Sequence, residues 1–87
     1  MLGDYILKAR RDRNMSQREL SSKVESIYGI KITSGMLSRY EKGTVQNLAL
    51  NNLFVLADYL NLDLNMIGHS EAAKLKTLNE EHHKFEE

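Results

Sequence analysis

The strongest structural signal in this sequence is the segment Ile32-Thr33-Ser34-Gly35-Met36-Leu37-Ser38-Arg39-Tyr40-Glu41-Lys42-Gly43. Thr33 is a good N-cap, because its hydroxyl can accept a hydrogen bond from an otherwise unpaired amide in the first turn of a helix. Ile32 and Leu37 have the spacing of a hydrophobic staple around that cap. Gly43 can adopt the left-handed conformation that ends a helix. The stretch therefore predicts a short helix that begins at Ser34 and ends before Gly43.

The two sides of this predicted helix differ in chemistry. One arc is apolar and contains Met36, Leu37 and Tyr40, whereas the other side carries small or cationic residues, namely Ser34, Gly35, Ser38 and Arg39. A helix that packs by one face and presents Ser, Gly and Arg on the other suits the major groove of DNA. An ordinary surface helix is the alternative interpretation of this stretch taken alone.

A second capped helix precedes this one. Ser16 and Glu19 have the spacing of a capping box, so a helix is predicted to begin at Gln17. Its apolar residues form a single stripe at helical spacing, Leu20, Val24, Ile27 and Tyr28. Two capped helices in succession, with Gly29 between them, predict a helix-turn-helix.

These pieces occur in an order that resembles the phage-repressor (Xre-type) helix-turn-helix family. The residues that carry the resemblance are Leu2-Gly3, Ile6, Ala9 and Arg10, then Met15-Ser16-Gln17-x-Glu19-Leu20, then Leu37-Ser38-Arg39-Tyr40-Glu41-x-Gly43, and finally Leu53-x-x-Leu56-Ala57-x-x-Leu60-Asn61-Leu62-Asp63-Leu64. The resemblance covers residues 2–67 and implies an all-α, five-helix, lambda-repressor-like DNA-binding domain. It also implies that Arg10 and Glu41 form a partly buried structural ion pair.

Composition and charge are compatible with this interpretation. The 87 residues suffice for one domain, the hydrophobic share is 41%, and the absence of proline and of strand-like alternation predicts an all-α chain. There is no cysteine, no apolar signal core and no run of membrane-spanning length, so we expect a cytoplasmic protein. The net charge is zero, but residues 1–50 hold nine Lys/Arg against five acids and residues 51–87 hold three against seven. This asymmetry favours a DNA-binding face backed by an acidic body.

The remaining helices are predicted from periodicity and caps. The first spans residues 4–13, with Ile6, Ala9 and Arg13 on its inward side and Asn14 as its stop. The fourth spans residues 49–60, with Asn47 as a candidate cap, and its expected buried residues are Leu50, Leu53, Phe54, Ala57 and Leu60. A short fifth helix follows the Asp63 cap, with Leu62 and Ile67 as staple partners, and is predicted to end at Gly68.

Residues 1–68 form the predicted DNA-binding domain, and residues 69–87 form a C-terminal tail. Ser70 could cap a further helix in this tail, in which four residues recur at the 3-4-3 spacing of a short helical seam, Leu75, Leu78, His82 and Phe85. The tail is interpreted either as a solvated segment or as a helix that packs on its own domain or on a second protomer, where it would assist self-association.

The chain departs from the family pattern between its second and third helices. Gln17 and Thr33 are sixteen positions apart, about six more than usual, which corresponds to about one extra helical turn and a longer connection. We therefore expect Ile27 and Tyr28 to be buried, and Ile30 and Ile32 to cover the end of the domain.

Site residues are assigned by side-chain chemistry and by the resemblance. Arg39 is the strongest candidate for a base contact, because its planar fork can donate two hydrogen bonds to guanine; the other candidates at the bases are Ser34, Ser38 and Gly35. The candidates for phosphate contacts are Gln17, Arg18, Lys31, Lys42, Thr44 and Gln46.

No catalytic or metal-binding arrangement is recognisable in the sequence. His82 and His83 are neighbours, so on a helix they would point about 100° apart and could not share a metal ion. We expect no enzyme activity and no cofactor. The predicted function is that of a sequence-specific transcription regulator, a repressor that binds a two-fold symmetric operator in double-stranded DNA as a homodimer. The alternatives are an antitoxin of the same fold or a helical interaction module that acts through a protein partner, and the chain could also be the DNA-binding part of a longer regulator.

Overall fold

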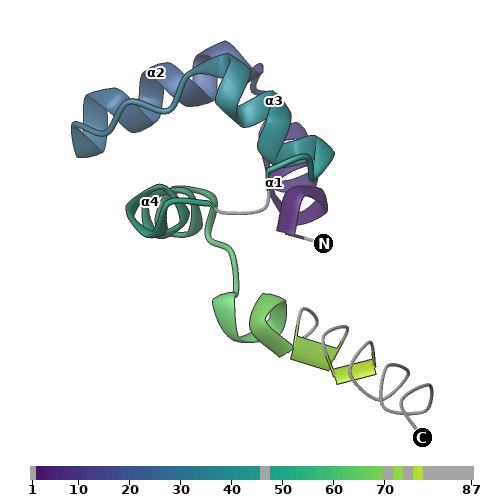
Figure 1. Ribbon diagram of the computed structural model, residues 1–87. Helices are drawn as coiled ribbons and strands as arrows, with labels where there is room; N and C mark the ends of the chain where they lie inside the picture. The colour runs from purple at the N-terminus through teal and green to yellow at the C-terminus, as the bar shows by residue number, and fades with distance from the viewer. Residues whose placement is uncertain (1, 46–47, 70–71, 74–75, 78–87) are drawn as a thin grey trace, which may run out of the picture.

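The computed structural model describes residues 2–45, 48–69, 72–73 and 76–77, and every regular segment among them is helical. The helices are α1 (Leu2–Asp12), α2 (Gln17–Tyr28), α3 (Ser34–Lys42) and α4 (Leu50–Leu60) (Figure 1). A fifth helical segment begins at Leu64 and continues through residue 69. The all-α fold predicted from the sequence is therefore confirmed.

Helices α2 and α3 begin at the caps that the sequence predicts. The Ser16 hydroxyl accepts a hydrogen bond of 3.0 Å from the Glu19 amide, and the Glu19 carboxylate accepts one of 3.3 Å from the Ser16 amide, which completes the capping box. The Thr33 hydroxyl accepts a 3.1 Å hydrogen bond from the Met36 amide. These local bonds fix where each helix of the helix-turn-helix starts.

Three helices end in the same left-handed turn. Asn14, Gly43 and Asn61 have positive φ angles of 55°, 72° and 56°, and each follows the last residues of a helix. In each case the next amide bonds to a carbonyl five residues back, as in Met15 to Arg10, Thr44 to Arg39 and Leu62 to Ala57. This is the Schellman arrangement, which satisfies carbonyls that the helix leaves unpaired. The stops predicted at Asn14 and Gly43 are confirmed.

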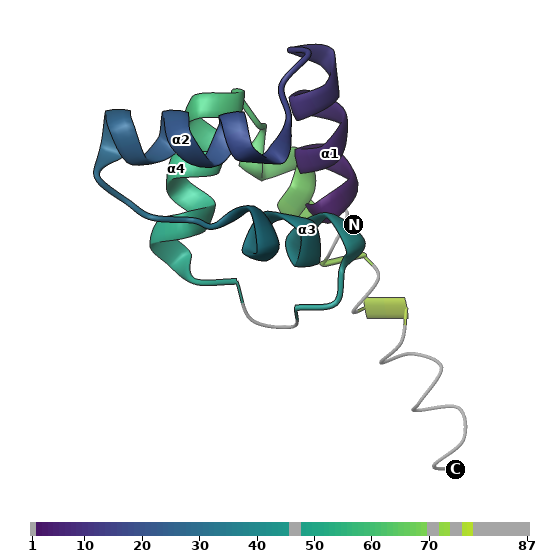
Figure 2. The same ribbon diagram turned by 90° about the horizontal axis from the view of Figure 1, so that it is seen from above.

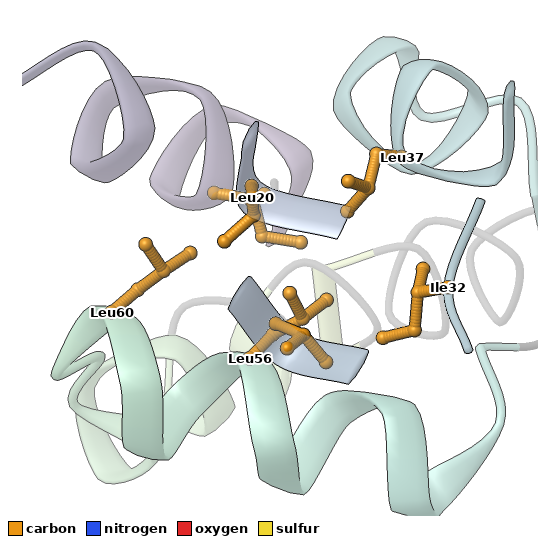
Figure 3. Close-up of a cluster of buried hydrophobic side chains, with 7 residues drawn as sticks. Leu20, Ile32, Leu37, Leu56 and Leu60 are labelled. Carbon is orange, nitrogen blue, oxygen red and sulfur yellow. The ribbon is translucent and has the colours of Figure 1, made fainter. Parts of the chain in front are cut away.

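One apolar core joins all four helices. Its buried residues are Ile6, Leu20, Val24, Ile32, Leu37, Leu56 and Leu60, some of which are labelled in Figure 3. Helices α1 and α2 each contact both α3 and α4, so α3 and α4 are held by the same pair of helices (Figure 2). Ile32, in the turn before α3, is fully buried, and Ile30 packs against the core, as the sequence predicts.

The prediction for α4 was partly wrong. Leu50 and Phe54, expected to be buried, are 61% and 50% exposed, whereas Leu56, which was not expected inside, is fully buried. Apolar residues occur almost all around this helix, so periodicity could not determine which side faces α1 and α2. The N-cap residue is Ala49, which makes no side-chain cap bond.

Arg13, predicted on the inward side of α1, is exposed because the chain has already turned away after Asp12. Its guanidinium donates a 2.7 Å hydrogen bond to the Tyr59 carbonyl and lies 5.4 Å from the centre of the Tyr59 ring. Arg13 therefore links α1 to α4 across the surface.

The end of α2 also differs from expectation. Tyr28 is half-buried and its hydroxyl donates a 2.7 Å hydrogen bond to Asp58, but Ile27 is 57% exposed. Both views show that the last turn of α2 extends beyond α4 (Figures 1 and 2), which agrees with the exposure of Ile27 on this turn.

The fifth helical segment is capped by Asp63, whose carboxylate accepts hydrogen bonds from the Asn65 and Met66 amides at 3.0 and 3.2 Å. Ile67 is buried, as predicted. The prediction that Gly68 ends the helix is wrong, since Gly68 and the residue after it are both helical. Gly68 has no left-handed φ that would stop the helix.

Several predictions concern residues outside the part of the chain that the structure describes, namely those for Gln46, Asn47, Ser70, Leu75, Leu78, His82, His83 and Phe85. Within the described part, no helix combines the length and the apolar character needed to cross a membrane.

Candidate nucleic-acid interface

Helix α3 is seated against the start of α1. Leu37 anchors α3 in the core, and Gly3 lies against the last turn of α3. A Cβ atom at Gly3 would collide with the Tyr40 carbonyl oxygen and would lie 2.7 Å from the Glu41 carbonyl oxygen. A glycine is therefore needed for α1 to approach α3 this closely. Sequence reasoning noted Gly3 only as part of the family pattern.

Arg10 and Glu41 form a two-pronged ion pair between α1 and α3. Arg10 Nε donates to Glu41 Oε2 at 2.8 Å, and Arg10 Nη2 donates to Glu41 Oε1 at 2.9 Å. A third guanidinium nitrogen, Nη1, donates to the Met15 carbonyl at 2.8 Å. Because Glu41 is only 9% exposed, this parallel fork holds the end of α3 in one orientation.

Glu41 also binds α2. The Gln17 amide nitrogen donates a 3.1 Å hydrogen bond to Glu41 Oε1, the same oxygen that Arg10 Nη2 contacts. One carboxylate therefore joins α1, α2 and α3. The position of Gln17 at the start of α2 predicts a phosphate contact. That prediction did not include the hydrogen bond from Gln17 to Glu41.

The environment of Glu41 keeps it ionised. Burial alone would raise the pKa of its carboxyl group, but hydrogen bonds from Arg10 and Gln17 and the positive charges of Arg10 and Arg11 outweigh burial and lower the pKa below its ordinary value. A charged Glu41 is the form that can accept from both neighbours.

The outward side of α3 carries the residues that were assigned to bases. Gly35 and Arg39 are exposed, and Ser34 and Ser38 are half-buried. Within the described part of the chain, no side chain forms an ion pair or a hydrogen bond with the Arg39 guanidinium. The four residues lie on the first two turns of α3, with a donor fork available at Arg39.

A small pocket next to these residues is lined by side chains from α1, α2 and α3. It is lined by Leu7, Arg10, Arg11, Gln17, Ser38, Glu41 and Lys42. Arg11 and Lys42 are exposed cations at this pocket. Sequence reasoning assigned Lys42 to a phosphate but gave no role to Arg11, although its place next to Arg10 on α1 could have suggested one.

The other phosphate candidates occupy separate places. Arg18 is exposed on the first turn of α2, and Lys31 is exposed in the turn between α2 and α3. The Thr44 hydroxyl donates a 3.3 Å hydrogen bond to the Arg39 carbonyl, so Thr44 also closes the end of α3. Gln46 lies outside the described residues.

Comparison with known families shows that residues 6–67 match a family model described as helix-turn-helix. The chain belongs to the phage-repressor-like (Xre-type) helix-turn-helix family. No curated protein and no solved structure matches it. Membership in this family indicates a DNA-binding transcription regulator, and the family is generally not enzymatic. In the described part of the chain, no three His, Cys, Asp or Glu side chains are grouped so that they could hold a metal ion.

Proposed function

We propose that this helix-turn-helix protein is a repressor that binds a two-fold symmetric operator as a homodimer, with α3 as the reading helix. The observation that supports the proposal is that α3 is held firmly on its inner side and exposed on its outer side. Its inner side is fixed by Leu37, by the contact with Gly3 and by the Glu41 bonds to Arg10 and Gln17. On its outer side, the Arg39 guanidinium has no hydrogen-bond or ion-pair partner among the described residues. A rigid helix with an available donor face is what base reading requires.

We assign the base contacts to Arg39, Ser34 and Ser38, with Gly35 as a point of close approach. Arg39 can donate two hydrogen bonds to O6 and N7 of a guanine. Ser34 and Ser38 can pair with several bases and so add less discrimination. The Cβ of an alanine at Gly35 would meet only the Thr33 hydroxyl, at 3.9 Å, so the space above Gly35 is open to DNA.

We assign phosphate contacts to residues around the two helix starts and the end of α3, namely Gln17, Arg18, Lys31, Lys42, Thr44 and Gln46. The amides at the start of α2 attract an anion, and Arg11 and Lys42 add positive charge at the adjoining pocket. Gln17 keeps a second N–H for a phosphate while its first bonds to Glu41.

A protein that occupies an operator blocks access for other proteins, so repression requires no activity beyond tight binding. The proposed domain is residues 1–68, and residues 69–87 are a tail that assists self-association. This role places the protein in the cytoplasm of a bacterial host, where the DNA of a bacterium, phage or plasmid is read.

The proposal is tested by selecting duplexes from a random pool with the full chain. We expect enriched sequences to contain an inverted repeat whose half-sites lie about one turn of DNA apart, roughly 10 base pairs. The Arg39→Ala variant is the control and should enrich duplexes without a preferred base at one position of each half-site. A pool that shows no enrichment, or enrichment of single half-sites only, would refute the symmetric operator.

A further inference from the structure

Helix α4 carries an apolar surface that no described part of the chain covers. Leu50 and Phe54 are 61% and 50% exposed and lie one helical turn apart, so their side chains are neighbours on one side of the helix. We call these two residues the α4 patch. Large apolar side chains exposed next to one another indicate an interaction site more often than single ones do.

The sequence around the α4 patch is free of charge. Between Lys42 and Asp58 the chain has no charged residue, although 28% of all its residues are charged. The nearest charged residue on this side of α4 is Asp58, one turn beyond Phe54, and its carboxylate accepts a hydrogen bond from the Tyr28 hydroxyl. A surface without cations is a poor partner for phosphates. It is suited to a contact with itself, because a two-fold contact uses the same patch on both copies, and a charge close to the symmetry axis would meet its own like charge.

The position of α4 connects the patch to the reading helix. The Asn52 amide nitrogen donates a 3.0 Å hydrogen bond to the Tyr40 hydroxyl, which links α4 to α3. Leu50 and Phe54 are each two residues from Asn52 along the chain. Two residues correspond to a rotation of about 200° around the helix axis, so Leu50 and Phe54 lie on nearly the opposite side of α4 from Asn52. The patch therefore points away from α3. A partner bound to the patch would have α4 between itself and the reading helix.

We propose that the α4 patch is the contact through which a second copy of this chain is placed on the operator. The inference rests on the proposed function, because a symmetric operator is what brings a second copy to this side. A pairing of two patches places the helices in the order α3, α4, α4, α3. Three steps of about 8–10 Å between close-packed helix axes span about 24–30 Å. The Tyr40 ring separates α3 from α4, so the outer steps are longer than close-packed ones, and the total approaches the roughly 34 Å between half-sites.

The patch is small for a stable dimer. A standard interface buries about 800 Å² on each partner, and two part-exposed side chains supply only a fraction of that area. The contact is therefore weak in free solution and becomes effective when both copies are held on one duplex, where the local concentration is high. This predicts cooperative operator binding by a protein that is largely monomeric when dilute.

The experiment uses the full chain with the double substitution Leu50→Gln and Phe54→Gln, which keeps good helix formers and adds no charge. The matched control is Ile27→Gln, which replaces a side chain of similar exposure, 57%, on α2. Thermal unfolding should be nearly unchanged in both variants. Sedimentation at high concentration should show a monomer–dimer dissociation constant raised at least about tenfold in the double variant only, since each substitution occurs twice in the contact.

DNA binding separates this inference from the proposed function. The probes are the selected duplex and a half-site duplex cut at its symmetry axis. The double variant should bind the half-site as the wild type does, but should lose at least about tenfold on the full site together with its cooperativity. A wild-type dimer constant and wild-type cooperativity in the double variant would overturn the inference, and so would an equal loss on both duplexes. Failure of the wild type to bind any selected duplex would instead overturn the proposed function, and sedimentation would still decide whether the patch self-associates.

Discussion

Among single residues, Glu41 contributes most to the position of α3 relative to α1 and α2. It is the only charged residue that is buried among the described residues. Glu41 belongs to α3 and accepts hydrogen bonds from Arg10 of α1 and Gln17 of α2. Removal of one partner of a buried pair leaves the other charge without compensation. Loss of DNA binding in an Arg10 or Glu41 variant would therefore report on the seating of α3, whereas loss in an Arg39 variant would report on contacts.

The pH dependence of stability should identify the charged form of Glu41. Its pKa is lowered in the folded protein, so its stabilisation is complete above the unfolded pKa of about 4.3 and is lost as the pH falls through the folded value. We expect Glu41→Gln to lower the free energy of unfolding by up to about 3 kcal/mol at pH 7. In urea titrations from pH 7 to 3, the difference from wild type should shrink below about pH 4. A difference that is constant with pH would contradict an ionised Glu41.

Two glycines should respond oppositely to alanine. Gly3→Ala places a Cβ against main-chain oxygens of α3, which cannot move aside as a side chain can, so we expect a loss of about 1–3 kcal/mol in urea unfolding. Gly35→Ala meets nothing closer than 3.9 Å and should stabilise by up to about 1 kcal/mol. If Gly35 approaches DNA closely, the same Gly35→Ala variant should nevertheless bind the selected operator more weakly.

Arg39 and Gln17 should differ in what they contribute to binding. Arg39→Ala should cost about 1–3 kcal/mol on the selected operator and much less on random DNA, because base contacts depend on sequence. Gln17→Ala should weaken both by similar factors. Filter binding on the two duplexes distinguishes them, and an equal loss in Arg39→Ala would reassign Arg39 to a phosphate.

At the scale of elements, the last turn of α2 shows how a longer helix is accommodated. The added length leaves Leu20, Val24 and Tyr28 on the core side, since steps of four residues drift slowly around the helix. Ile27, on the same last turn, remains exposed to solvent. Tyr28 links α2 to α4 through the hydrogen bond from its hydroxyl to Asp58. This bond, and to a lesser extent burial, raises the pKa of Tyr28 above its ordinary value.

Neighbouring substitutions at this end of α2 should therefore have unequal effects. Tyr28 is only half-buried, so Tyr28→Ala should cost about 1.5–3 kcal/mol, less than the loss of a fully buried aromatic side chain. Ile27→Ala should change stability by less than about 0.5 kcal/mol, as is usual for exposed positions. Chemical denaturation of the two variants measures both values, and equal losses would show that Ile27 is packed.

At the scale of the whole molecule, charge is divided along the chain. Residues 1–50, which contain α1, α2 and α3, carry a balance of +4, and residues 51–87 carry −4. A protein without net charge can still bind DNA when its cations gather on the face that meets the phosphates.

The affinity for DNA should therefore fall steeply as salt is added. Each phosphate contact releases counterions, so the logarithm of the binding constant should fall linearly with the logarithm of salt concentration. Lys42→Gln should reduce this slope by about 1 if Lys42 binds a phosphate, whereas Lys8→Gln on α1, outside the assigned contacts, should not. A flat titration of the wild type would contradict the assignment of α3 and its flanks to DNA.

The local features of this protein could be predicted from its amino-acid sequence. The capping box at Ser16, the Thr33 cap and the stops at Asn14 and Gly43 depend on bonds between residues at most five positions apart, so the letters alone predict them. The helices of the helix-turn-helix follow from these signals. Fold class was predictable for the same reason.

Which helix surfaces pack against each other could not be predicted in the same way. The outward side of α4, the need for glycine at position 3 and the bond from Gln17 to Glu41 all involve partners on different helices. Such contacts depend on how whole helices are oriented around one core. Polar side chains interrupt α4 only at Asn51, Asn52 and Asp58, so its hydrophobic pattern indicates that orientation only weakly. The packing of α4 against α1 and α2 left Leu50 and Phe54 in solvent.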